Sequence, residues 1–238
     1  MFQDRKHPCR RRFEPDFSRF PSVVFESDDW GACETAPNPV SACQYLQLFG
    51  RRQDAVTGTL ESPAHLEALF AVLRRHCGVD KQTAVFTAFT SMGNPDFPAI
   101  EEAGFQRYID IGFDQGVPPA WCSDGVLERM RAGQQEGLWE PEYHSLLHHV
   151  SPRLWMELLN ADSREGQLAR NLFKLQIYAQ GRHIPEYEGY TLPEQNECIR
   201  TGFSRFRNAF GYLPRAAVTS DAYPETEILW AVNGIRTI

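Results

Sequence analysis

Two short stretches of the chain carry side chains that can bind a metal ion. Residues 23–31 form an apolar run of β-forming residue types that includes two adjacent carboxylates, Asp28 and Asp29. Farther along, His144 and His148 stand four residues apart. One carboxylate and two imidazoles make a three-ligand set that leaves a coordination position open. That set is typical of a hydrolytic zinc site and not of a structural one.

Strands and helices alternate along the chain, and these elements must position the two stretches. A strand over 21–27 would deliver both carboxylates to its C-terminal edge. Apolar spacing and capping residues predict helices between the strands. Such alternation indicates parallel strands joined by helical crossovers, in an open sheet or a barrel. We expect further strands at 83–90, 215–220 and 235–238, and helices at 62–77, 97–105, 123–135, 153–160, 163–180, 193–210 and 225–233.

The composition restricts the partners and the location of the protein. The chain has 238 residues, a formal net charge of -7 and a pI near 5.5, which argues against binding to nucleic acids or anionic membranes. It contains no apolar run of 18 residues, so we expect no membrane span. The six scattered cysteines form no CxxC motif, and no apolar segment follows the basic N-terminal residues. Both features favour a cytoplasmic protein with reduced thiols. We expect one domain over 21–238 after an N-terminal arm over 1–20.

Neither stretch is specific by itself. Two histidines at this spacing occur by chance in roughly one chain in six with this many histidines. Adjacent aspartates after a strand more often form a turn or a helix cap than a ligand pair. The two stretches carry weight only together and in this order.

Together they resemble the motifs of the NodB-type polysaccharide deacetylases, carbohydrate esterase family 4. That family has Thr/Ser-Phe-Asp-Asp-Gly after its first strand and His-Ser/Thr-x-x-His after a later one. Residues 27–31 (SDDWG) stand for the first motif and residues 144–148 (HSLLH) for the second. The resemblance implies a distorted (β/α)7-type barrel, with Asp28 as the catalytic base and Asp29, His144 and His148 as metal ligands. It also implies a divalent ion, zinc first and cobalt, nickel or iron as alternatives, and removal of N-acetyl groups from a sugar or glycan precursor.

The chain departs from the family pattern in three places. Trp30 stands between the aspartates and the glycine, and no Arg-x-Pro motif is recognisable near 217–224. The Leu-x-His motif that supplies the family's general acid is missing. We therefore expect a barrel that is incomplete at its C-terminal end, with an exposed strand edge that favours self-association. Four residues are expected to line the substrate site: Trp30, Tyr143, Asp221 and Tyr223.

Two alternatives to a sugar deacetylase stay open. One is a catalytically incompetent relative that binds only metal or carbohydrate, which the missing acid and the missing Arg-x-Pro favour. The other is a metal-dependent amidohydrolase acting on a different amide, such as a cyclic imide or ureide. An assay of acetate release separates the first alternative from an active enzyme, and a panel of amide substrates separates the second.

Overall fold

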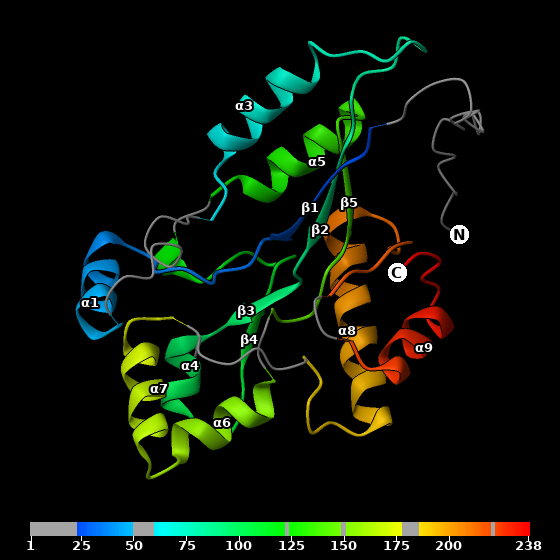
Figure 1. Ribbon diagram of the computed structural model, residues 1–238. Helices are drawn as coiled ribbons and strands as arrows, with labels where there is room; N and C mark the ends of the chain where they lie inside the picture. The colour runs from blue at the N-terminus through cyan, green and yellow to red at the C-terminus, as the bar shows by residue number, and fades with distance from the viewer. Residues whose placement is uncertain (1–22, 50–59, 122–123, 149–150, 178–185, 220–221) are drawn as a thin grey trace.

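The computed structural model describes residues 23–49, 60–121, 124–148, 151–177, 186–219 and 222–238 (Figure 1). Within these ranges the chain forms a mixed α/β structure with a small parallel sheet and eight α-helices. The expected N-terminal arm over 1–20 lies outside the described residues. No described helix is both long and apolar enough to cross a membrane.

The central sheet contains three parallel strands in the order β1 (Phe25–Trp30), β2 (Phe86–Thr90) and β5 (Trp139–Tyr143). Two isolated parallel bridges extend it, one joining Tyr143 to Ala217 and the next joining Ala216 to Thr237. The strands predicted near 215–220 and 235–238 are therefore short segments that add to the sheet in chain order. This order is the one that a barrel would need, but the described strands form an open sheet, and the expected (β/α)7 barrel is not confirmed.

Helices cover one face of this sheet. Trp139 and Tyr143 lie four residues apart on β5, so both side chains point to the same face. Trp139 packs against Phe70 of α3 (Pro63–Leu73), and α5 (Val126–Glu136) lies beside that helix in Figure 1. Tyr143 packs against Phe203 of α8 (Leu192–Phe210) and against Trp230 of α9 (Pro224–Val232). The main hydrophobic core therefore lies between the sheet and these four helices.

A smaller unit lies between β2 and β5 in the sequence. β3 (Gly93–Pro95) and β4 (Asp110–Gly112) pair antiparallel, and α4 (Phe97–Glu102) joins them. Phe97 of α4 packs with Trp155 of α6 (Pro152–Asn160) and Phe173 of α7 (Arg164–Lys174). This aromatic cluster forms a second core beside the C-terminal ends of the parallel strands (Figure 1).

Most of the predicted elements are present, although their bounds differ in several places. The helix predicted over 163–180 ends at Lys174, and Gln176 has a positive φ of 58°, which ends a right-handed helix. The helix predicted from Ser123 begins at Val126, after Gly125. A helix that was not predicted, α1 (Pro39–Phe49), follows β1, with the Asn38 side chain accepting a hydrogen bond from the Ser41 N–H.

Candidate metal centre

The carboxylate of the site comes from an irregular end of β1. Ser27 pairs with Ala88 and Trp30 pairs with Thr90, so β1 holds one more residue than β2 over this interval. Asp29 lies in the resulting bulge with φ of 66°, a left-handed conformation that aspartate tolerates better than most residues. A bulge re-aims the side chains that it carries. The irregular backbone therefore sets the direction of the Asp29 side chain.

The segment that follows Asp29 is fixed by side chains from elsewhere in the chain. The amide of Asn94 donates to the Gly31 carbonyl at 2.8 Å, and its oxygen accepts from the Cys33 N–H at 2.7 Å. A carboxylate oxygen of Glu61 accepts from the Gly31 N–H at 3.0 Å. These bonds hold residues 31–33 in place, although this segment has no regular secondary structure.

The two histidines lie in a loop and not on a helix. His144 directly follows β5, and its N–H donates to the Thr90 carbonyl at 3.1 Å. Glu186, which is buried, accepts from the N–H groups of Leu146 and Leu147 at 2.8 and 3.0 Å. The loop between the histidines is thus held by a carboxylate from a distant segment. The imidazole centroids are 4.8 Å apart.

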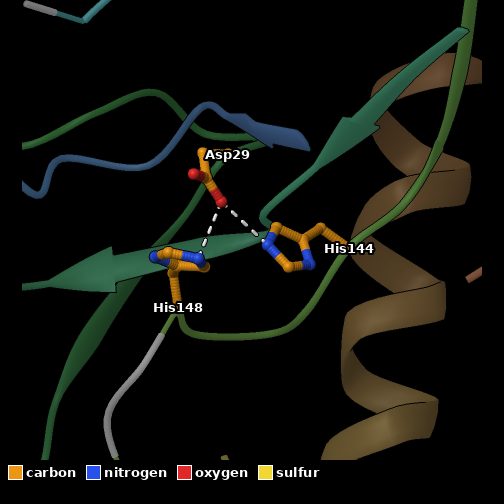
Figure 2. Close-up of side chains that lie close together, drawn as sticks. All are labelled: Asp29, His144 and His148. Atoms are coloured by element: carbon orange, nitrogen blue, oxygen red, sulfur yellow. Dashed lines mark hydrogen bonds and ion pairs between the residues drawn. The ribbon is translucent and has the colours of Figure 1, made fainter. Parts of the chain in front are cut away.

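Asp29, His144 and His148 converge on one point, as expected from the two motifs (Figure 2). Nε2 of His144 lies 2.9 Å from Asp29 Oδ1, and Nε2 of His148 lies 2.7 Å from the same oxygen. One ligand atom from each residue lies within 4.8 Å of the others. β2 lies between β1 and β5, which places the two outer strands roughly 9.5 Å apart. The bulge at Asp29 and the loop that follows β5 bring the three side chains together across this distance.

Each imidazole is also held through its second nitrogen. His144 Nδ1 lies 2.7 Å from the carbonyl oxygen of Val218, and His148 Nδ1 contacts the carboxylate of Glu34. A carbonyl oxygen can only accept, so Nδ1 of His144 carries a proton and donates it. Both partners leave Nε2 pointing at Asp29. Metal-binding histidines in proteins are oriented in this way, by a carbonyl or carboxylate at the far nitrogen.

The environment of the site shifts the pKa values of Asp29 and His144 from their usual ranges. Burial on its own would raise the pKa of Asp29, but hydrogen bonds and charges from the two histidines outweigh it and hold that pKa well below its usual range. Burial acts against a charged His144, yet its bonds to Asp29 and Val218 raise its pKa above the usual value. The histidine side chains are 2% and 4% exposed, whereas that of Asp29 is 49% exposed. The site is therefore open to solvent from the Asp29 side.

These three residues fit a divalent transition metal ion. A carboxylate and two imidazoles suit zinc, and also cobalt, nickel or iron. The orientation of both Nδ1 atoms supports this fit independently of the spacing in the sequence, because an imidazole that serves only for packing has no need of a fixed tautomer. The structure supports a metal site of this kind.

The other predicted site residues do not all lie at the metal centre. Asp28 lies on β1 with an exposed side chain. Trp30 is half-buried and packs edge-on against Trp139 of the core, with ring centroids 4.7 Å apart. Tyr143 is 0% exposed and also belongs to the core, which corrects the expectation that it lines the substrate site. Tyr223 precedes α9 and its hydroxyl donates to Glu188. Asp221 lies outside the described residues.

Sequence reasoning missed the residues that support the site. Glu34, Glu61, Asn94 and Glu186 belong to no recognisable motif, and Val218 contributes only its carbonyl oxygen. The available signal was a carboxylate within a few residues of the aspartate pair, and both Glu26 and Glu34 meet it.

Comparison with known proteins adds no relative. No protein-family model matches the chain, and neither the curated proteins nor the solved structures gave a significant match. The geometry of the site and the resemblance of its two motifs are therefore the observations that bear on function.

Proposed function

We propose that the protein is a metal-dependent hydrolase that removes N-acetyl groups from a sugar or glycan precursor. The observation that carries this proposal is the convergence of Asp29 with two imidazoles whose far nitrogens are both fixed. Asp29, His144 and His148 would hold the ion. When bound, the ion would supply a Lewis acid that polarises the acetyl carbonyl and lowers the pKa of water.

The remaining roles fall to residues of the chain. Asp28 would take a proton from the attacking water, because it is adjacent to Asp29 and its side chain is open to solvent. The leaving amine needs a proton donor. Glu61 is our candidate, since burial raises its pKa to about 7 and it binds the N–H of Gly31, two residues after Asp29.

The wider setting is also part of the proposal. The described cysteines 33, 43, 77 and 198 are free thiols, which supports a reducing, cytoplasmic location.

β1 is an outer strand of the described sheet, and Val23 and Val24, which precede it, are 74% and 71% exposed. An exposed strand edge of this kind supports the proposal of self-association.

The test is acetate release from N-acetylglucosamine and its short oligomers by protein loaded with zinc or cobalt. The proposal predicts release that disappears in Asp28→Asn and in His144→Ala. Hydrolysis of a ureide or cyclic imide without any acetate release would instead establish an amidohydrolase acting on a non-sugar amide.

One observation favours a second candidate, a protein that binds metal or carbohydrate without hydrolysis. Tyr143, which was expected to line the substrate site, is buried in the core. Metal binding at the three ligands with no turnover of any N-acetyl sugar, ureide or imide would support this candidate.

A further inference from the structure

A buried side chain of β3 contacts the segment that joins two parts of the metal centre. Residues 31–33 connect the region of Asp29, a proposed metal ligand, to Glu34, whose carboxylate contacts Nδ1 of His148. The side chain is that of Asn94, which is 0% exposed and makes hydrogen bonds at both ends of this segment. Asn94 therefore lies between two structural features on which the site depends.

The Asn94 amide binds this segment as a neighbouring strand would. Its Nδ2 donates to the Gly31 carbonyl at 2.8 Å, and its Oδ1 accepts from the Cys33 N–H at 2.7 Å. In a parallel sheet, one residue likewise bonds to a carbonyl of the adjacent strand and to the N–H two residues later. The pairing of β1 with β2 ends at Trp30 and Thr90. The side chain thus continues the hydrogen-bonding pattern past the end of β1.

An asparagine suits this position for a chemical reason. Only asparagine and glutamine carry a donor and an acceptor on one planar amide. Both contacts of Asn94 are buried, and a buried polar group that loses its partner destabilises the arrangement around it. The amide therefore fixes the path of the chain between Asp29 and Glu34.

We propose that Asn94 is a positioning residue of the metal centre. By fixing residues 31–33, it sets the Asp29 carboxylate, which would bind the ion, relative to the Glu34 carboxylate, which orients His148. Asn94 thus acts on two ligands without contacting the ion, as outer residues of metal sites do. This inference rests on the proposed metal centre and does not depend on the reaction catalysed there.

The test compares zinc binding by Asn94→Ala and Asn160→Ala in the full chain. Asn160, at the end of α6, donates to the carbonyls of Phe105 and Met156 at 2.8 and 2.9 Å. Its replacement therefore also removes two hydrogen bonds of an asparagine amide. Asn94→Ala should lower the affinity for zinc by about tenfold or more, measured by competition with a chelating dye, and Asn160→Ala should leave it unchanged.

The cobalt-loaded proteins separate positioning from a general loss of stability. The visible absorption of bound cobalt depends on the number and arrangement of its ligands. The spectrum should change in Asn94→Ala and should be that of the wild type in Asn160→Ala. A variant that is only less stable, but still folded, would keep the wild-type spectrum.

A measurement on the wild type tests the inference even if Asn94→Ala does not fold. If the Asn94 bonds favour the metal-binding arrangement, zinc must in turn favour these bonds. Zinc should therefore slow hydrogen exchange of the Cys33 N–H by about tenfold. The Gly104 N–H, which donates to the Glu101 carbonyl after α4, should exchange at the same rate with and without zinc.

Each contrary result has a distinct meaning. Wild-type zinc affinity and a wild-type cobalt spectrum in Asn94→Ala would overturn the inference and leave the metal centre standing. Equal losses of zinc affinity in Asn94→Ala and Asn160→Ala would show destabilisation in place of positioning. Exchange of the Cys33 N–H that does not respond to zinc would also overturn the inference. A wild-type chain that binds neither zinc nor cobalt would overturn the metal centre itself, and this inference with it.

Discussion

His148 is held between two carboxylates, with Nδ1 against Glu34 and Nε2 2.7 Å from Asp29 Oδ1. The Glu34 contact fixes the ring so that its free nitrogen points at the site proposed for the metal. Carboxylates in this position typically contribute 10–100-fold to metal affinity.

Removal of Glu34 should therefore weaken metal binding while the ligands stay intact. We predict that Glu34→Ala lowers the affinity for zinc about 10–100-fold, measured by competition with a chelating dye. Glu26→Ala removes an exposed carboxylate from the same part of the chain and serves as the control. Equal affinities for zinc in Glu34→Ala and in the wild type would show that Glu34 does not orient His148.

Asp28 and Asp29 are adjacent but are assigned different roles. We predict that Asp28→Asn abolishes acetate release and leaves the metal content nearly unchanged, because a base is not needed to hold the ion. Metal analysis and the activity assay on the same sample check this. Loss of the metal from the variant would make Asp28 a ligand and reverse the two roles.

Gly31 occupies a crowded left-handed position directly after the bulge. It has φ of 76°, and an added Cβ would lie 3.0 Å from the Phe113 ring and 3.1 Å from the Ser91 carbonyl oxygen. Gly104 has φ of 61° and nothing within 4 Å of such a Cβ, so Gly104→Ala is a matched control for the backbone conformation alone.

We predict that Gly104→Ala lowers the free energy of unfolding by about 1–2 kcal/mol through backbone strain. Gly31→Ala should lower it by about 1–3 kcal/mol more through overpacking. Urea denaturation of the two variants measures the difference. Equal losses of free energy in the two variants would show that the neighbours of Gly31 move to accommodate a methyl group without a further loss of stability.

The Glu61 carboxyl should make stability depend on pH. Burial raises its pKa from the usual 4.5 to about 7, so the folded state holds this proton more tightly than the unfolded state does. The contribution of the protonated Glu61 carboxyl to the free energy of unfolding is complete below the pKa of this group in the unfolded chain. It is lost as the pH rises through the pKa of the group in the folded protein.

We predict that between pH 5 and pH 8 the wild type loses more free energy of unfolding than Glu61→Gln does. Urea denaturation at several pH values across this range measures both proteins. Parallel curves for the two proteins would mean that Glu61 titrates at its ordinary value.

Local signals in the sequence located most of the helices and strands. Ser62 caps α3 by accepting from the His65 N–H, and Gly211 ends α8 with φ of 86°, both at the predicted positions. α1 was missed, although Asn38 followed by a proline is a helix start of the same kind. Closure of a barrel could not be predicted in this way, because it depends on which strands meet at the ends of the sheet and not on any local pattern.

The ligands of the candidate site were predicted from their residue types and order, but their geometry was not. A spacing of four residues would bring His144 and His148 to one face of a helix, whereas a loop held by Glu186 brings them together. The bulge that turns Asp29 toward them depends on pairing with β2, which lies about 60 residues away. Val218 contributes a backbone carbonyl, which is present in every residue and so leaves no mark in a sequence.

The most direct test of the metal centre is the number of zinc ions bound per chain after loading and extensive dialysis. The geometry predicts one ion in the wild type and in His76→Ala, which alters an exposed histidine, and no retained ion in His144→Ala combined with His148→Ala. Both variants should keep the circular dichroism spectrum of the wild type. A wild-type chain that retains no ion, or a double variant that retains the same ion, would contradict the account of this site.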